Sequence, residues 1–332
     1  MENLDSFLNK FSKIADPPIK KILSLGVDKK NQALVKYQIE AGGKRIRPIL
    51  AIVCCQLFGG KVKDILYPAA GLEIIHDYSL IIDDIIDRGV LRRRKKTACA
   101  NYGKSIAECV GVDYAASIMQ AANRSNDPVK ISELFSKALK RLVDGEILDI
   151  LFEQTGREDE PYVQKNRYLK ITEADYLKMI GGKTAALIMT ACETGAISAG
   201  ASDKNIKILG EYGFNLGLAF QVRDDILDIF GNKKTFDKEV GKDIKERKLG
   251  NIVILLGLKE FGSSDRKKFL AIMRKKEIEE NDVKEGIGLL AKTNARQKAE
   301  ILAEKFIEKA KKSLSCLPQN KWRDTLEELS NF

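Results

Sequence analysis

The chain has 332 residues, 31% of them charged and 44% hydrophobic, and its formal net charge is +10. A chain of this length can bury a large core, and its basic charge points to nucleic acid, an anionic membrane surface or an anionic small substrate as partner. Nucleic acid is the weakest of these, because the sequence has no aromatic RNA-binding motif and no zinc-finger spacing.

The six cysteines form no C-x-x-C pair and only one histidine is present, so we expect no zinc site. The N-terminal segment MENLDSFLNKFSK is charged and lacks the apolar core of a signal peptide. No stretch approaches 18 uninterrupted apolar residues, which predicts no transmembrane span. These features predict a cytoplasmic protein with reduced thiols and leave a peripheral membrane contact open.

The first motif is AGGKRIRP at residues 41–48. Its two glycines allow the backbone to approach a ligand closely. Donors for phosphate oxygens follow at Lys44, Arg45 and Arg47. Taken alone, the motif is explained better by a basic loop before a helix that begins at Pro48.

An apolar segment of helical pattern follows, SLIIDDIIDRG, with Asp83, Asp84 and Asp87. Residues i and i+4 share a helix face, so Asp83 and Asp87 point together. His76 lies seven residues before Asp83 and thus on nearly the same face. A lone histidine is usually a structural residue, but this location favours contact with a ligand.

A basic run, Arg92-Arg93-Arg94-Lys95-Lys96-Thr97, comes next. Arg92 stands five residues beyond Asp87, which is enough for a chain reversal that returns cations over the carboxylates. The alternative is a solvated basic loop. In the second half, after a predicted polar loop at 155–166, GGKTAAL places Lys183 and Thr184 behind two glycines, which an ordinary helix start explains equally well.

A long helix is predicted at 206–230, and it carries a second Asp-Asp-x-x-Asp copy at Asp224, Asp225 and Asp228. Clustered carboxylates in an apolar setting repel each other and need a cation, and hard carboxylate ligands suit Mg²⁺ shared with a substrate phosphate. One copy could be a solvated acidic face, but two copies favour metal binding. A predicted loop at 231–248 then runs from Lys238 to Lys248, so a basic loop flanks each acidic helix, as a magnesium diphosphate ligand would require.

The last strong pattern is an apolar stripe of helical spacing near the C-terminus, made of Ala295, Ala299, Leu302, Phe306 and Ala310. No convincing alternation of period two occurs anywhere. The sequence therefore predicts an all-α protein of long, packed helices. Because the two acidic motifs lie in different halves and would share one metal cluster, we expect one large helical domain over residues 1–332.

In order and spacing, these motifs resemble those of trans-isoprenyl diphosphate synthases, the family that includes farnesyl and geranylgeranyl diphosphate synthases. The matching segments, over about residues 40–250, are GGKRIRP, His76 with SLIIDD, DDIID followed by two arginines, KT at 183–184, FQVRDDILD and the later Lys–Gly–Asp–Lys string. The resemblance implies the all-α isoprenoid synthase fold, a homodimer, and Mg²⁺-dependent head-to-tail condensation of isopentenyl diphosphate with an allylic diphosphate.

The resemblance also implies roles for individual residues. Three Mg²⁺ ions in each active site would be bound by Asp83, Asp84, Asp87, Asp224 and Asp225, with Asp228 acting more indirectly; these five and Lys183 are the expected catalytic residues. The allylic diphosphate would contact Arg92, Lys183, Thr184, Gln221, Lys238 and Lys248. Isopentenyl diphosphate would be held by Lys44, Arg47, His76 and Arg93, with Arg45 as an additional contact.

The chain departs from the family pattern in its loops. A glycine and a proline are common after the first motif, where this chain has Arg94 and Lys96, and a common histidine is replaced by Cys99. A later G-K-x-T is Arg247-Lys248-Leu249-Gly250. These changes put the loop conformations in doubt, more than the class of reaction.

Product length is predicted from Tyr78 and Ser79, just before the first motif. In families of this kind, a large aromatic here often forms part of the tunnel floor, and one aromatic beside a small residue favours a geranylgeranyl (C20) product. Farnesyl (C15) and C25 products are the alternatives. Tyr78 could also be an ordinary core residue with no role in product length.

Two other functions compete with prenyl elongation. A class I terpene cyclase is disfavoured by the second DDILD, and a noncatalytic partner subunit is suggested by the altered 94–99 loop.

Overall fold

The computed structural model describes residues 4–231 and 240–331. The chain divides into two compact units, the first made of residues 1–140, 187–213 and 310–332 and the second of residues 141–186 and 214–309. Compact units do not always fold independently, so the single domain expected over residues 1–332 stays a prediction.

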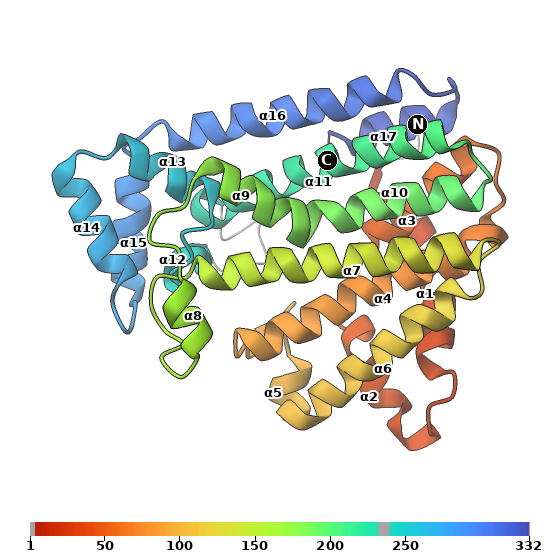
Figure 1. Ribbon diagram of the computed structural model, residues 1–332, viewed down its shortest axis with the longest axis horizontal. Helices are drawn as coiled ribbons and strands as arrows, with labels where there is room; N and C mark the ends of the chain where they lie inside the picture. The colour runs from red at the N-terminus through yellow and green to blue at the C-terminus, as the bar shows by residue number, and fades with distance from the viewer. Residues whose placement is uncertain (1–3, 232–239, 332) are drawn as a thin grey trace. The chain divides into compact units, whose positions relative to one another are not determined.

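The first unit is helical, with one short hairpin (Figure 1). Its strands β1 (Leu91–Arg92) and β2 (Lys95–Lys96) pair antiparallel. Its helices are α1 (Leu4–Ser24), α2 (Gln32–Glu40), α3 (Ile46–Leu57), α4 (Val62–Ile86), α5 (Ala98–Tyr102), α6 (Lys104–Ala122), most of α10 (Ala186–Ser198) and α17 (Lys321–Leu329). Three helices, α7 (Pro128–Leu151), α11 (Asp203–Phe230) and α16 (Ala295–Leu314), begin in one unit and end in the other.

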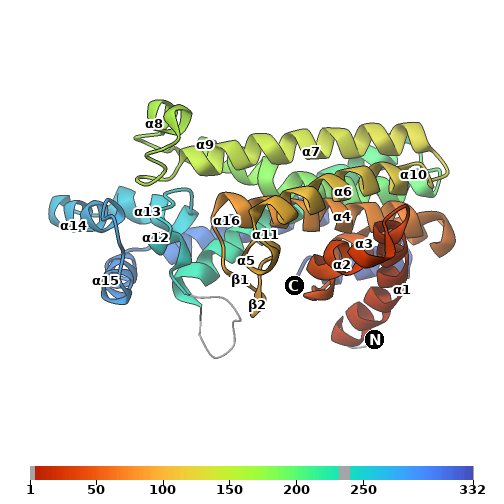
Figure 2. The same ribbon diagram turned by 90° about the horizontal axis from the view of Figure 1, so that it is seen from below.

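Helix α4 is the central helix of the first unit and carries the first acidic motif at its C-terminal end. Leu72, Ile74 and Ile75 are fully buried, and burial of each such side chain stabilises the fold by about 1.5–3 kcal/mol. Helix α6 runs alongside α4 (Figures 1 and 2). By length and composition α4 could cross a membrane, but 61% of its most apolar window is buried inside the structure, as expected for a core helix.

The second unit contains α8 (Pro161–Asn166), α9 (Glu173–Ile180), the π-helical turn η2 (Gly181–Ala185), α12 (Lys242–Lys245), α13 (Ile252–Glu260), α14 (Ser263–Met273) and α15 (Glu280–Leu290). Thr172 and Asp175 form a capping box at the start of α9, and the Asn251 side chain caps α13. The core of this unit includes Phe152, Tyr176 and Phe269.

The all-α prediction is confirmed, and the helices expected at 206–230 and along the C-terminal stripe are α11 and α16. The loop predicted at 155–166 is wrong in its second half, where Pro161 begins α8, because proline at the first helical position loses no hydrogen bond. The loop predicted at 231–248 contains α12 among its described residues.

Candidate active site

The first acidic motif lies at the C-terminal end of α4, where Asp87 donates its N–H to the carbonyl of Asp83 at 2.8 Å. Asp83 and Asp87 are partly exposed, whereas Asp84 is buried. Arg92 donates to Asp84 through Nε at 3.0 Å and Nη2 at 2.9 Å. Burial opposes the charge on Arg92, but the Asp84 carboxylate outweighs it and raises the pKa of Arg92. Two residues predicted to bind metal and diphosphate therefore hold each other in place.

The chain forms the β1–β2 hairpin although it lacks the glycine and proline that are common in this loop. Arg93 and Arg94 have φ of 50° and 62°. A two-residue hairpin turn of type I′ requires positive φ at both positions, which costs roughly 1–2 kcal/mol for each non-glycine residue. Thr97 offsets part of this cost, because its hydroxyl donates to Gly89 at 2.7 Å and accepts from Ala100 at the start of α5.

Four residues predicted to hold isopentenyl diphosphate gather in the first unit. Arg93 Nη1 donates to the carbonyl of Gly42. Burial, followed by the positive charges of Arg47 and Arg93, lowers the pKa of His76 well below its ordinary value, so His76 is neutral. The Nε of Arg47 is buried without a hydrogen-bond partner. Lys44 is exposed on the loop that precedes α3, and the cluster therefore offers cationic donors to an anion.

Gly43 and Arg45 give this loop its shape. A Cβ at Gly43 would lie 2.7 Å from Arg45 Nη1 and 2.9 Å from Arg93 Nη1, and its φ of +147° is strained for other residues. Arg45 is buried and donates to Asp16 at 2.8 Å, to Glu73 at 3.2 Å, and to the carbonyls of Ile39 and Gly42. Arg45 thus anchors the loop from within, unlike the additional ligand contact expected of it.

The second acidic motif, on α11, is largely bonded to its own unit. Asp225 accepts from the Tyr176 hydroxyl at 2.8 Å, Gln221 Nε2 at 2.9 Å and the Ile252 N–H at 3.0 Å. Asp228 accepts from the backbone N–H groups of Lys242 and Asp243 at the start of α12. Asp224 is partly exposed.

These carboxylates lie close enough to repel one another. Burial and the nearby Asp243 carboxylate raise the pKa of Asp228 to about 8, and the same two causes raise the pKa of Asp225 well above its ordinary value. Asn251 donates to Asp243 at 2.8 Å but brings no charge. A cation at this end of α11 would relieve the repulsion, so the donor set fits a divalent metal.

Two predicted diphosphate ligands, Lys183 and Lys248, share one buried carboxylate on α7. Lys183 Nζ lies 2.8 Å from Asp149 Oδ2 and 2.6 Å from Glu146 Oε2, and Lys248 Nζ lies 3.3 Å from the same Asp149 oxygen. Burial alone would raise the pKa of Asp149, but the two lysines outweigh it and lower that pKa. Sequence reasoning missed Glu146 and Asp149, whose i, i+3 spacing on one helix face was the available signal.

Glycines bring α7 and η2 into this contact. A Cβ at Gly145 would lie 2.2 Å from the backbone nitrogen of Lys183, and a Cβ at Gly182 would lie 2.5 Å from the carbonyl oxygen of Arg141. The two backbones therefore touch directly. Thr184, next to Lys183, donates to Gln221 Oε1 at 2.7 Å and so links η2 to α11.

The first unit thus gathers the first motif, Arg92 and the four isopentenyl diphosphate residues, and the second unit gathers Lys183, Thr184, Gln221, Lys248 and the second motif. Lys238 lies outside the described residues. Within residues 4–231 and 240–331, no three His, Cys, Asp or Glu side chains are placed to hold a metal ion. The convergence of both motifs on one metal cluster stays a prediction.

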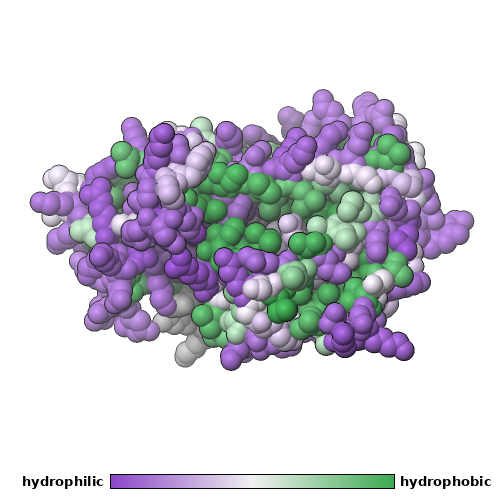
Figure 3. Space-filling model, turned by 60° about the horizontal axis from the view of Figure 1, so that its bottom comes forward, coloured by the Kyte–Doolittle hydropathy of each residue, from purple (hydrophilic) through white to green (hydrophobic). Residues whose placement is uncertain are grey.

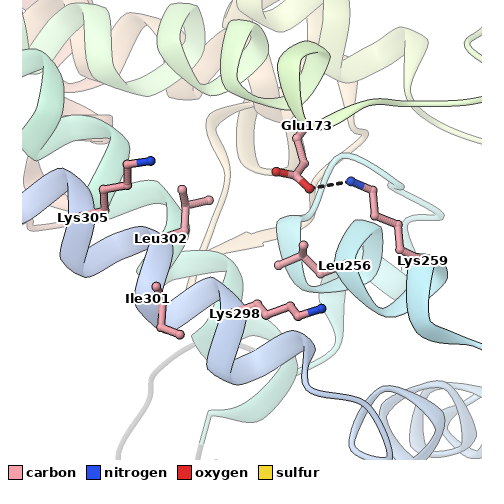
Figure 4. Close-up of a pocket in the computed structure, with 7 residues that line it drawn as sticks. All are labelled: Glu173, Leu256, Lys259, Lys298, Ile301, Leu302 and Lys305. Carbon is pink, nitrogen blue, oxygen red and sulfur yellow. Dashed lines mark hydrogen bonds and ion pairs between the residues drawn. The ribbon is translucent and has the colours of Figure 1, made fainter.

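A groove of about 360 Å³ on the second unit contains none of these residues (Figure 4). Figure 4 shows Glu173 paired with Lys259 on one side and Ile301 and Leu302 of α16 on the other. The chemistry indicated by the motifs therefore lies elsewhere.

Known proteins match the chain along its whole length. Residues 28–290 match the family described as Polyprenyl synthetase. A short chain isoprenyl diphosphate synthase of Methanothermobacter thermautotrophicus is 32% identical, with all of this chain and 98% of that protein covered. The crystal structure of a geranylgeranyl pyrophosphate synthetase from Pyrococcus horikoshii is 30% identical with a TM-score of 0.87, and covers 100% of this chain and 98% of that chain. The crystal structure of a polyprenyl synthase from Caulobacter crescentus, solved with calcium and isoprenyl diphosphate, is 30% identical with a TM-score of 0.87. The match covers 98% of this chain and 94% of that chain.

Proposed function

The chain belongs to the polyprenyl synthetase family and is a short-chain trans-polyprenyl diphosphate synthase, and we propose that its main product is geranylgeranyl diphosphate (C20). Tyr78 and Ser79, just before the first acidic motif, carry the chain-length proposal. The geranylgeranyl pyrophosphate synthetase among the similar structures supports it.

We further propose that the divalent metal is Mg²⁺, bound by Asp83, Asp87 and Asp224, which are partly exposed. Asp228 is partly exposed as well, but it accepts hydrogen bonds from the backbone of Lys242 and Asp243. When bound, the metal would neutralise charge that grows on the leaving diphosphate. Asp84 would act by holding Arg92, and Asp225 by holding Gln221 and Tyr176.

The remaining chemistry follows from the basic residues. Lys183, Lys248 and Arg92 bind oxygens of the allylic diphosphate and stabilise its charge as the carbon–oxygen bond breaks. The other substrate, isopentenyl diphosphate, is held by the cluster of Lys44, Arg47 and Arg93 so that its double bond attacks the allylic carbon. A proton then leaves the new prenyl chain, and the released diphosphate accepts it. No side-chain nucleophile is required.

The decisive experiment is incubation of the purified chain with isopentenyl diphosphate and each allylic primer, followed by chain-length analysis of the products. A C20 main product supports the proposal. A main product of C30 or longer would overturn the chain-length assignment, and absence of any elongation by the chain alone would favour the noncatalytic partner subunit.

Replacement of Tyr78 by alanine should lengthen the products. Its ring packs on α6 opposite Gly111, where a Cβ would meet the ring at 3.6 Å, so truncation opens space beside the proposed tunnel floor. The measurement is the product distribution of Tyr78→Ala, with Tyr67→Ala, an aromatic on the same helix three turns earlier, as the matched control. An unchanged distribution in an active, folded Tyr78→Ala enzyme would rule out the floor assignment.

Replacement of Lys44 or Arg93 by alanine should weaken isopentenyl diphosphate binding selectively. Loss of one charged hydrogen bond costs about 1.5–3 kcal/mol, which corresponds to a KM roughly 10–150 times higher. The KM of the allylic substrate should change little, and Lys96→Ala, on the same hairpin, serves as the control. If the allylic KM rises instead, the two diphosphate sites are exchanged.

A homodimer is our proposal for the assembly. Helix α6 exposes a stripe of small and apolar residues at helical spacing, Ile106, Cys109, Val112, Ala116 and Met119, of which Val112 is 72% and Met119 63% exposed. Hydrophobic side chains gather on the face that Figure 3 draws, the side on which Figure 2 shows α6. An apolar stripe of this kind supports burial against a second copy, which sedimentation of the purified protein measures. A cytoplasmic location remains a further proposal.

A further inference from the structure

Asp77 is an unusual residue for the centre of a helical unit. Its side chain is 0% exposed, and neither carboxylate oxygen has a hydrogen-bond partner. Burial of an ionised carboxylate without a partner is costly, and such groups call for a specific explanation. Asp77 lies on α4 directly after His76 and one turn beyond the buried Glu73.

Charged groups from several elements face Asp77. Arg45 and Arg47 come from the start of α3, Arg93 from the β1–β2 turn, and Glu73 from α4 itself. From α6, the buried Tyr114 also faces Asp77, and its hydroxyl donates to the carbonyl of Val35 on α2. From α1, Asp16 binds Arg45.

We propose that Asp77 is a positioning residue that couples the binding of isopentenyl diphosphate to the uptake of one proton, acting through Arg47 and Arg93. This inference rests on the proposed role of those two arginines. Ionised Asp77 cancels one positive charge of the cluster that receives the diphosphate. Protonated Asp77 leaves the full charge of both guanidinium groups to the ligand.

Arg47 and Asp77 both contain buried polar atoms that make no hydrogen bond. Arg47 has a buried Nε–H without an acceptor, and Asp77 has two buried oxygens without a donor. A diphosphate supplies acceptors to the arginine, and a proton satisfies the carboxylate. Binding of the anion therefore favours protonation of Asp77, and by linkage protonation favours binding of the anion.

The direction of the pH dependence follows. Burial and, after it, the negative charge of Glu73 raise the pKa of Asp77 to about 7. The positive charges of Arg45, Arg93 and Arg47 lower this pKa, but by less. Below this value Asp77 already carries its proton and binding is tight. Above it the proton must be taken up on binding, so affinity falls by up to about tenfold for each pH unit.

The test compares the full-length wild type with Asp77→Asn, which mimics the protonated form. The KM for isopentenyl diphosphate and kcat are measured across neutral to alkaline pH, with Asp113→Asn as the control. Asp113 is on α6, has an orphaned carboxylate oxygen of its own, and is not among the charges that face Asp77. We expect the wild type and the control to lose affinity as pH rises, Asp77→Asn to lose much less, and kcat to match in all three.

Calorimetry provides a second readout. Isopentenyl diphosphate without an allylic partner binds without condensing, and titrations in buffers of different protonation enthalpy count the protons taken up. Asp77→Asn should take up about half a proton fewer than wild type near pH 7, and up to about one proton fewer a pH unit or more above it. Equal uptake in both proteins would overturn the proposal while the proposed function stands, whereas absence of binding to wild type would overturn both. If Asp77→Asn does not fold, Asp77→Ser offers the same comparison.

Discussion

Alanine in place of Asp83 should lower the turnover of prenyl elongation by about 100-fold or more while the fold persists. Asp83 is one of the two partly exposed carboxylates at the end of α4, one helical turn from Asp87. Its removal takes a ligand from the proposed metal site without leaving a buried charge unpaired. The measurement is kcat at saturating substrates, with the melting temperature as the check on folding.

Asp64→Ala is the matched control for Asp83→Ala, since Asp64 lies in the first turn of the same helix. It should retain elongation activity. Excess chelator should abolish wild-type activity, and added Mg²⁺ should restore it. Full activity in chelator, or an Asp83→Ala enzyme as fast as Asp64→Ala, would refute the metal assignment.

Alanine in place of Asp149 should damage stability and activity together. The Asp149 carboxylate forms ion pairs with both Lys183 and Lys248, and removal of one partner from a buried ion pair costs about 3–5 kcal/mol. Since both lysines are 11–23% exposed, we expect about 3 kcal/mol in the free energy of unfolding. The KM of the allylic substrate should also rise, because two of its proposed ligands lose their common anchor.

Denaturant unfolding and steady-state kinetics measure the two effects. Asp144→Ala, at an exposed position on α7, is the control and should be nearly neutral. A double variant of Asp149→Ala with Lys248→Met should regain part of the stability without regaining activity. Lys183 keeps its pair with Glu146 at 2.6 Å in Asp149→Ala, whereas the more buried Lys248 keeps a longer pair, with Glu246 at 3.4 Å. An Asp149→Ala protein as stable as the control would show that Glu146 alone suffices for Lys183.

The sequence predicted much of the fold because its signals are local. The period of apolar residues is enough to place α11 and α16 within a few residues. Placing these two helices needed no knowledge of which helices pack against each other. A common role for Arg47, His76 and Arg93 came instead from the resemblance to trans-isoprenyl diphosphate synthases, and that role stays a prediction.

The remaining features depend on tertiary contacts that no local pattern encodes. Lys183 meets Asp149 across 34 positions of the chain, and this contact exists only because two glycines let α7 and η2 touch. The sequence alone does not distinguish Asp77 from the other polar residues of α4, so its complete burial was not predicted. Likewise, Arg93-Arg94 lacks the asparagine or glycine that normally signals a two-residue hairpin turn, so surrounding contacts override local preference there.

The direct backbone contact between α7 and η2 has a consequence for engineering. A library that substitutes small residues close to Lys183 would include Gly145 and Gly182. Any side chain at either position must move main chain rather than another side chain. Such variants would also shift the ammonium group of Lys183 relative to Asp149 and Glu146. Substitutions intended to alter chain length would then lower turnover instead, so both positions are best left unchanged.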